Sequence, residues 1–192
     1  MAETIQFEQV MENLAGTLPS LYAIATVFFI VGGLWLTFFA ILDLAQLSES
    51  RRKYLGTQQP SGAGVIIKLF VAGLMLNFAL SGQTANVISS MFFSDNSYQL
   101  ITIESYVSDP EESAVQRLTR ITLFGFMQVV GIIAIFKGLR VFAKISDRSS
   151  QESGWHGAAY LIYGTLCMQF AKVLSVIENT IGFSVFSILG IK

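Results

Sequence analysis

The chain has 192 residues, of which 53% are hydrophobic and 13% are charged, and its formal net charge is −1. Soluble domains carry about 25% charged residues, so half of the usual solvating surface is missing. The small net charge excludes an overall basic field for nucleic acid. Together with a mean hydropathy of +0.59, these values predict a multi-pass membrane protein.

The first predicted element is a short amphipathic helix over residues 1–17, where apolar side chains recur at helical spacing opposite three glutamates. Residues 21–42 follow without a charged side chain. A helix of that length covers roughly 33 Å, which is enough to cross a hydrocarbon core of about 30 Å. Pro19 suits the first turn of this membrane helix, and Asp43 ends the uncharged run.

A weaker second span is predicted over residues 65–92, which completes a first hairpin over residues 18–92. Lys68 lies near one end, from which its side chain can extend to the membrane surface. Asn77 interrupts the apolar centre, and Ser, Gly, Gln and Thr residues dilute the second half. This span is therefore expected to need protein neighbours on its polar side.

Residues 93–120 are predicted to form an acidic loop, and a third span covers residues 121–136, with Gln128 as its one strongly polar side chain. Within the loop, residues 108–112 place capping side chains before a proline and two glutamates. This order is a strong signal for the start of a helix. We therefore expect one helix over residues 110–145 that contains the third span.

A fourth span is predicted over residues 154–177, with Gln169 and Lys172 inside it and a break or polar patch at Glu178. The apolar tail that follows, residues 180–191, is too short to cross a membrane alone. We expect this tail to lie at the membrane surface or on a partner protein.

Basic residues concentrate in the loops inside the two hairpins, whereas the loop between the hairpins is mainly acidic. The positive-inside rule therefore predicts that the basic loops face the cytoplasm and that both termini and the acidic loop face outward. The predicted fold is a single membrane domain, residues 1–192. It is all-α and polytopic, with four transmembrane helices as two hairpins, and the second hairpin with the tail occupies residues 121–192.

The two hairpins share residues at matched spacings, which indicates either a parallel repeat or a chance match between apolar hairpins. The matched residues of the first helices are Gly33, Phe38, Ala45 and Ser48 with Gly131, Phe136, Ala143 and Ser146. Those of the second helices are Gly62, Leu69, Leu74, Asn77, Phe78 and Ala79 with Gly154, Leu161, Leu166, Gln169, Phe170 and Ala171.

The sequence contains no recognisable catalytic or cofactor-binding arrangement. His156 is the only histidine and Cys167 the only cysteine, so a catalytic triad, a His-rich metal site and an internal disulfide all lack their partners. No glycine-rich phosphate loop occurs, and the glycines lie mostly in the spans. We therefore expect no enzymatic activity, no metal and no cofactor.

Polar side chains inside the predicted spans are the informative positions, because a charge at the bilayer centre costs roughly 2.5–3.5 kcal/mol on insertion scales. They fit either a substrate path or contacts between helices, and we favour the second role. Small residues four apart at Ala134 and Gly138 add a close-packing signal, and Lys172 and Glu178 are expected to contact another subunit. The predicted helix-packing or partner contacts are Asn77, Gln128, Ala134, Gly138, Gln169, Lys172 and Glu178.

The segment VGIIAIFKGL at residues 130–139 resembles small membrane proteins of type IVB secretion systems. The acidic N-terminal helix, the loop at residues 50–52 and the glycine-rich start of the fourth span share this resemblance. It is a resemblance to the IcmC/DotE group of the Dot/Icm apparatus, to its DotV-like relative and to the TraQ-like proteins of IncI conjugation. The order of helices and loops is similar over most of the chain. The resemblance does not distinguish a DotE-like from a DotV-like member.

This resemblance implies a non-enzymatic subunit of the bacterial inner membrane. In that membrane, the outward-facing termini that the positive-inside rule predicts would lie in the periplasm. Such a subunit would help to form the membrane channel that exports effector proteins or conjugative DNA. The implied partners are the lipid bilayer, a DotA-like channel protein and small DotE/DotV/DotP-like proteins in a hetero-oligomer, with no direct nucleic-acid site.

Two other functions also fit the residues. A pilin-like subunit would be small, apolar and helical as well, and its detection in sheared extracellular filaments would favour it. A small transporter would fit a parallel repeat with polar residues inside the spans. Substrate-dependent uptake into proteoliposomes would establish this second alternative.

Overall fold

The computed structural model describes residues 2–49, 61–81, 114–145 and 153–182. The elements in these ranges are all helices, which confirms the predicted all-α class: α1 Ala2–Glu49, α2 Gly62–Ser81, α4 Ala114–Ile145, α5 Gly154–Met168 and α6 Phe170–Ile181. The predicted acidic loop lies outside the described residues up to residue 113, and its last part, residues 114–120, already belongs to α4. The predicted tail lies outside them from residue 183.

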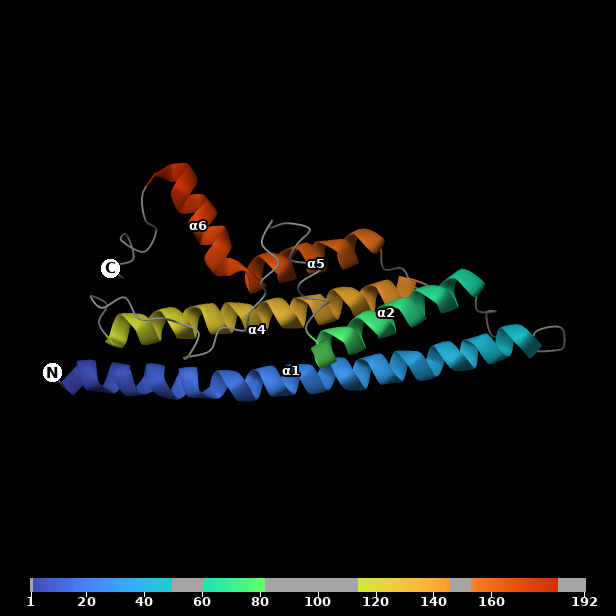
Figure 1. Ribbon diagram of the computed structural model, residues 1–192, viewed down its shortest axis with the longest axis horizontal. Coiled ribbons are helices and arrows are strands. Elements are labelled where there is room, and N and C mark those ends of the chain that lie inside the picture. The colour runs from blue at the N-terminus through green and yellow to red at the C-terminus, as the bar shows by residue number, and fades with distance from the viewer. Residues whose placement is uncertain (1, 50–60, 82–113, 146–152, 183–192) are drawn as a thin grey trace.

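Helix α4 lies at the centre of the bundle and contacts all four other helices (Figure 1). Helices α1 and α4 run in the same direction, because Leu18 faces Gly125 and, farther along both helices, Phe29 packs against Phe136. Helix α2 runs back along α1, and α5 runs back along α4. The two hairpins therefore point the same way.

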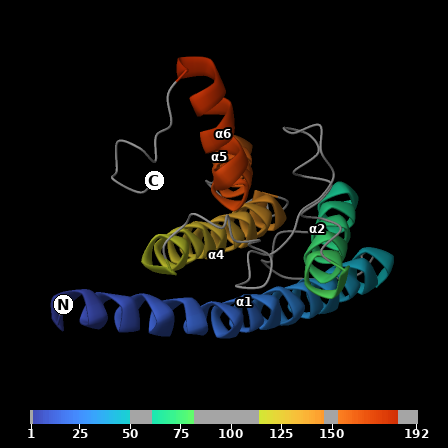
Figure 2. The ribbon, with the colours of Figure 1, turned by 60° about the vertical axis from the view of Figure 1, so that its left-hand side comes forward.

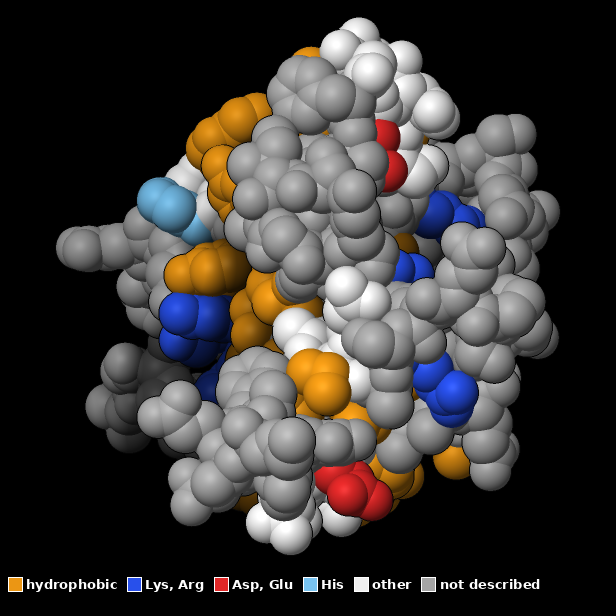
Figure 3. All heavy atoms as spheres, turned by 90° about the vertical axis from the view of Figure 1, so that its left-hand side faces the viewer, with side chains coloured by type: hydrophobic (Ala, Val, Ile, Leu, Met, Phe, Trp, Pro, Cys, Tyr) orange, Lys and Arg blue, Asp and Glu red, His pale blue; other side chains and the backbone are white. Residues whose placement is uncertain are grey.

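Three helical segments are long and apolar enough to cross a membrane: Gln9–Leu47, Gly62–Ser81 and Val115–Ile145. Helices α5 and α6 add a fourth only if this bent pair counts as one span. Seen from the end at which α1 begins, hydrophobic side chains reach the surface among patches of Lys and Arg (Figure 3). Because large exposed apolar surfaces mark contact with membrane or protein, these helices are consistent with a membrane location.

We expected an amphipathic helix followed by a separate membrane helix in the N-terminal region. The structure does not divide this region. Helix α1 is one helix of 48 residues with Pro19 inside it. Its buried side chains continue past the proline at alternating spacings of three and four, with Ala15 and Leu18 before it and Tyr22 and Ala25 after it. A proline inside a helix costs about 3 kcal/mol, and packing against α4 on both sides of Pro19 offsets that cost.

The last predicted span breaks at Gln169 rather than at Glu178, where we expected a break or polar patch. Helix α6 leaves α5 at an angle of 78° and points away from α1 (Figures 1 and 2). The backbone stays hydrogen-bonded through the turn, because the Gln169 N–H donates to the Thr165 carbonyl and the Val173 N–H donates to the Gln169 carbonyl, both at 3.0 Å. The Phe124 ring of α4 packs against Phe170 at 6.0 Å between centroids, which holds the start of α6 on α4.

Candidate functional site

Gln128 lies in the contact between α1 and α4, with only 1% of its surface exposed. The Tyr22 hydroxyl donates a hydrogen bond to Gln128 Oε1 at 2.8 Å and lies 3.3 Å from the Gly125 carbonyl oxygen. Burial of a polar group costs free energy unless the group is hydrogen-bonded. This pair therefore joins the first helices of the two hairpins, which supports a helix-packing role for Gln128.

Tyr22→Phe is expected to lower the free energy of unfolding by about 0.6–1.7 kcal/mol, the range of hydrogen bonds between helices in membranes. A double-mutant cycle with Gln128→Leu isolates the interaction, and the double variant should lose less stability than the sum of the single losses. Unfolding is followed by circular dichroism while the protein is moved from mild detergent into SDS. Strictly additive losses would rule out a direct contribution of this hydrogen bond.

Helices α4 and α5 approach closely where glycines of the two helices face each other. A Cβ atom built on Gly131 would lie 2.5 Å from the Gly164 carbonyl oxygen, and one built on Gly138 would lie 3.0 Å from the Gly157 carbonyl oxygen. Gly138 was predicted as a packing residue, and Ala134 is half-buried on the same helix. The other three glycines, Gly131, Gly157 and Gly164, were not predicted, because we searched for small residues four apart. In each helix the two glycines are seven residues apart, and this spacing could have indicated them.

The other predicted contact residues lie elsewhere in the bundle. Asn77 is exposed near the end of α2, where the Ser81 hydroxyl donates to its backbone carbonyl at 2.9 Å. Gln169 is buried at the break between α5 and α6, and Lys172 and Glu178 are half-buried on α6. The seven predicted residues thus belong to three helices and one break, and none is among the described residues that line the cavity between α1, α2 and α4.

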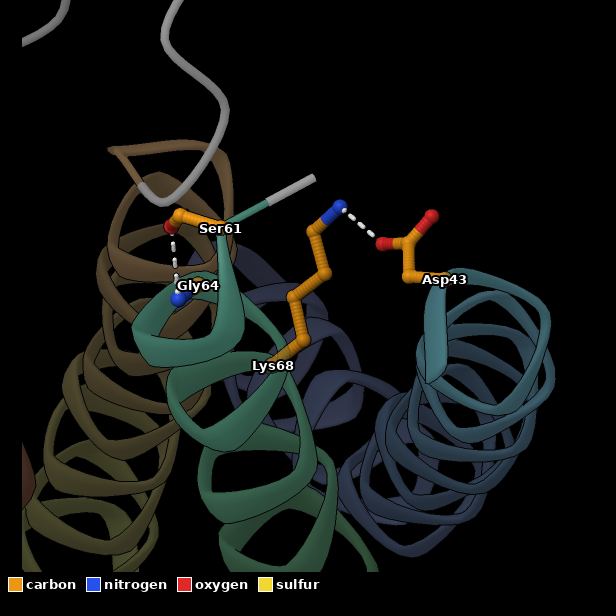
Figure 4. A network of polar contacts seen from close by, with 4 residues as sticks. All are labelled: Asp43, Ser61, Gly64 and Lys68. Carbon is orange, nitrogen blue, oxygen red and sulfur yellow. Dashed lines mark hydrogen bonds and ion pairs between the residues drawn. The ribbon is translucent and has the colours of Figure 1, made fainter. Parts of the chain in front are cut away.

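An ion pair joins α1 to α2 at the loop end of the first hairpin. Lys68 Nζ lies 2.8 Å from Asp43 Oδ2, and the two side chains are 13% and 18% exposed. Figure 4 shows them pointing toward each other near the start of α2, where the Gly64 N–H donates to Ser61 Oγ at 3.0 Å. The sequence predicts a Lys68 side chain that extends to the surface, but it does not reveal this partner, because the pairing depends on how the two helices are aligned.

A cavity of about 430 Å³ lies between α1, α2 and α4. Its lining consists of four aromatic side chains of α1 and α4, five other apolar or small residues, and three cationic side chains, Lys68, Arg140 and Lys144. Its volume falls within the range of about 300–1,000 Å³ that is usual for ligand sites. The described residues that line it include no histidine, cysteine, serine or carboxylate.

In the described part of the chain, no three His, Cys, Asp or Glu side chains are placed to hold a metal ion. His156 is exposed at the start of α5, and Cys167 is half-buried in the same helix.

The fold and these contacts define the class: an all-helical protein with three helices, or four with the bent pair, that are long and apolar enough to cross a membrane. Comparison with family models, with curated proteins and with solved structures finds no match.

Proposed function

We propose that this chain is a non-enzymatic subunit of the bacterial inner membrane that helps to form the export channel of a type IVB secretion or conjugation apparatus. The resemblance at residues 130–139 favours this family. The architecture supports a subunit, because the described helices provide a binding cavity and apolar surfaces but no cluster of catalytic side chains. The observation that carries the proposal is one uncovered face of α1.

This face, which we call the α1 stripe, consists of apolar side chains spaced three and four residues apart. Each is more than half exposed, although the opposite face of α1 is packed on α4: the stripe contains Ile24, Val27, Val31, Leu34 and Phe38. The same spacing aligns side chains for knobs-into-holes packing with a second helix. The stripe therefore provides a surface on which a membrane helix of another subunit can pack.

Affinity purification of the full chain in gentle detergent, with partners identified by mass, tests the proposal. We expect large membrane and periplasmic secretion proteins to co-purify with the chain. Leu34→Ala combined with Phe38→Ala should reduce their recovery several-fold while the yield of the chain is unchanged. Leu80→Ala is the matched control, because Leu80 is 77% exposed on α2, outside the stripe.

Recovery of the chain without secretion proteins would contradict the proposal. If the protein were found in extracellular filaments, the pilin-like alternative would replace it. Substrate-dependent uptake by the chain alone in proteoliposomes would instead establish the transporter alternative.

We also propose that the two hairpins are copies of one ancestral hairpin. A Cβ atom built on Gly33 would lie 3.3 Å from the Ala72 carbonyl oxygen, just as one built on Gly131 would lie 2.5 Å from that of Gly164. These residues correspond in the alignment of the two hairpins, in which Gly33 matches Gly131 and Ala72 matches Gly164. The agreement supports duplication, since a chance match of apolar residues would not place corresponding pairs at both helix crossings.

A further inference from the structure

Helix α6 begins close to the level at which the uncharged run of α4 begins. The Phe170 ring lies 6.0 Å from the Phe124 ring of α4, measured between the ring centroids. Phe124 follows Arg120, the last charged residue before this run, by four residues, which is a rise of roughly 6 Å. Charged side chains at the end of an apolar span reach to the headgroups. The start of α6 therefore lies just inside one surface of the membrane.

Helix α5 by itself reaches from this surface to the opposite one. Gly138 of α4 faces Gly157 of α5, and the two helices are antiparallel. Trp155 lies two residues before Gly157, and Arg140 lies two residues after Gly138, so Trp155 and Arg140 lie at the same level. Trp155 is 75% exposed, and tryptophan is enriched at membrane surfaces. Helix α6 is therefore not needed to complete the crossing.

The direction of α6 keeps it near the depth at which it begins. It leaves α5 at 78° and points away from α1 (Figures 1 and 2). A helix of 12 residues is about 18 Å long and advances only about 4 Å along the direction of α5 at this angle. Gly182 ends α6 with a φ of 79°, and its N–H donates to the Glu178 carbonyl at 2.8 Å.

The side chains of α6 divide into an apolar face and a polar face. Apolar side chains follow one side at helical spacing: Val173, Leu174, Ile177 and Ile181. The opposite side carries a cation, a hydroxyl and an amide: Lys172, Ser175 and Asn179. Val176 and Glu178 lie at the two borders. Ile177 and Ile181 are 37% and 53% exposed, so the apolar face reaches the surface of the bundle.

We propose that α6 lies in the plane of the bilayer, with its apolar face among the acyl chains and its polar face among the headgroups. Interfacial helices bury their apolar face about 5–10 Å into this boundary, which matches the depth at which α6 begins. The second half of a span would instead place Lys172 and Glu178 in hydrocarbon, where charges are costly. Only a membrane around the helices is required, so the secretion proposal can fail without affecting this one.

The depth of two positions on one side of α6 tests its direction. The full chain, with Cys167→Ala, is reconstituted in nanodiscs of phosphatidylcholine, and single spin-labelled cysteines are compared by their accessibility to oxygen and to a nickel chelate. Leu174→Cys and Ile181→Cys lie two turns apart on the same side. Their depths should differ by about 2 Å in the proposed orientation and by about 10 Å if α6 continues in the direction of α5. Tyr163→Cys, 65% exposed on α5, is the deep reference.

The two faces of α6 are tested separately. A label at Asn179→Cys should be several-fold more accessible to the nickel chelate than a label at Ile181→Cys, because the first faces the headgroups and the second faces the acyl chains. Addition of Ile177→Glu should raise the accessibility of the Ile181→Cys label several-fold, since a carboxylate on the apolar face opposes its insertion. Ser175→Glu is the matched control on the polar face and should leave that label unchanged.

A depth difference near 10 Å between Leu174→Cys and Ile181→Cys would overturn the proposal, because α6 would then continue the span. High nickel accessibility at both positions would also overturn it, because the apolar face would lie in water, where a partner protein could cover it. Circular dichroism and elution volume establish that each variant is folded. If Leu174→Cys is not folded, Ile177→Cys replaces it, with about 1 Å expected against about 6 Å for a span.

Discussion

Gly131→Ala is expected to destabilise the protein by about 3 kcal/mol, at the upper end of the usual range for overpacking. The added Cβ would lie 2.5 Å from the Gly164 carbonyl oxygen and 2.7 Å from the Met168 backbone nitrogen. Because both atoms belong to the backbone of α5, no side chain can rotate away to make room. Helix α5 must move as a whole, and the free energy of unfolding in an SDS titration measures the cost.

Two other glycines provide matched controls for this variant. Gly73 lies in α2 with no atom within 4 Å of a built Cβ, so Gly73→Ala should be neutral or stabilise the helix by up to about 1 kcal/mol. A Cβ on Gly33 meets the Leu76 side chain at 2.8 Å and the Ala72 carbonyl oxygen at 3.3 Å. Gly33→Ala should therefore fall between the two. If Gly131→Ala unfolds at the same SDS fraction as Gly73→Ala, the close crossing of α4 and α5 is wrong.

Asp43→Ala is the variant with the second-largest expected effect, a loss of about 2 kcal/mol of stability. Removal of one partner from a fully buried ion pair costs about 3–5 kcal/mol. The Asp43 and Lys68 side chains are 18% and 13% exposed, and Lys68 can extend toward the membrane surface, so we expect a smaller value. The midpoint of the same SDS titration, monitored by circular dichroism, measures the loss.

The companion variant is Asp43→Ala combined with Lys68→Met. It removes both charges and keeps an apolar chain of similar length, so it should recover most of the stability that Asp43→Ala loses. Full retention of stability in Asp43→Ala would show that the ion pair contributes nothing. A double variant that is less stable than Asp43→Ala would show that Lys68 stabilises the hairpin without Asp43.

Helices α1, α2, α4 and α5 could be predicted from the sequence because each contains a long run without charge. Pro19 shows where this kind of prediction ends. Read locally, it begins a helix, but Leu18 and Tyr22 pack against α4 on either side of it and keep α1 continuous. The Tyr22 contact with Gly125 joins residues 103 positions apart. A local sequence pattern contains no information about such a contact, so it cannot show that the contact offsets the cost of a proline.

The candidate contact residues were predictable to the extent that they stand out in their own helix. Gln128 does so as an amide in an apolar span, whereas its partner Tyr22 does not, since a tyrosine near a span end needs no special explanation. The bend at Gln169 was not predicted, because the preceding and following residues have ordinary helical sequences. The cavity was not predicted either, because its lining comes from three helices whose alignment only the fold determines.

The short length of α5 has a consequence for the surrounding lipid. Helix α5 has 15 residues and reaches about 22 Å, less than the roughly 30 Å of a bilayer's hydrocarbon. The uncharged run of α1, residues 21–42, reaches roughly 33 Å. The bundle therefore presents unequal hydrophobic thickness on its two sides. Such a mismatch is relieved by tilting and by local thinning of the bilayer, so the protein should gather short-chain lipids beside α5.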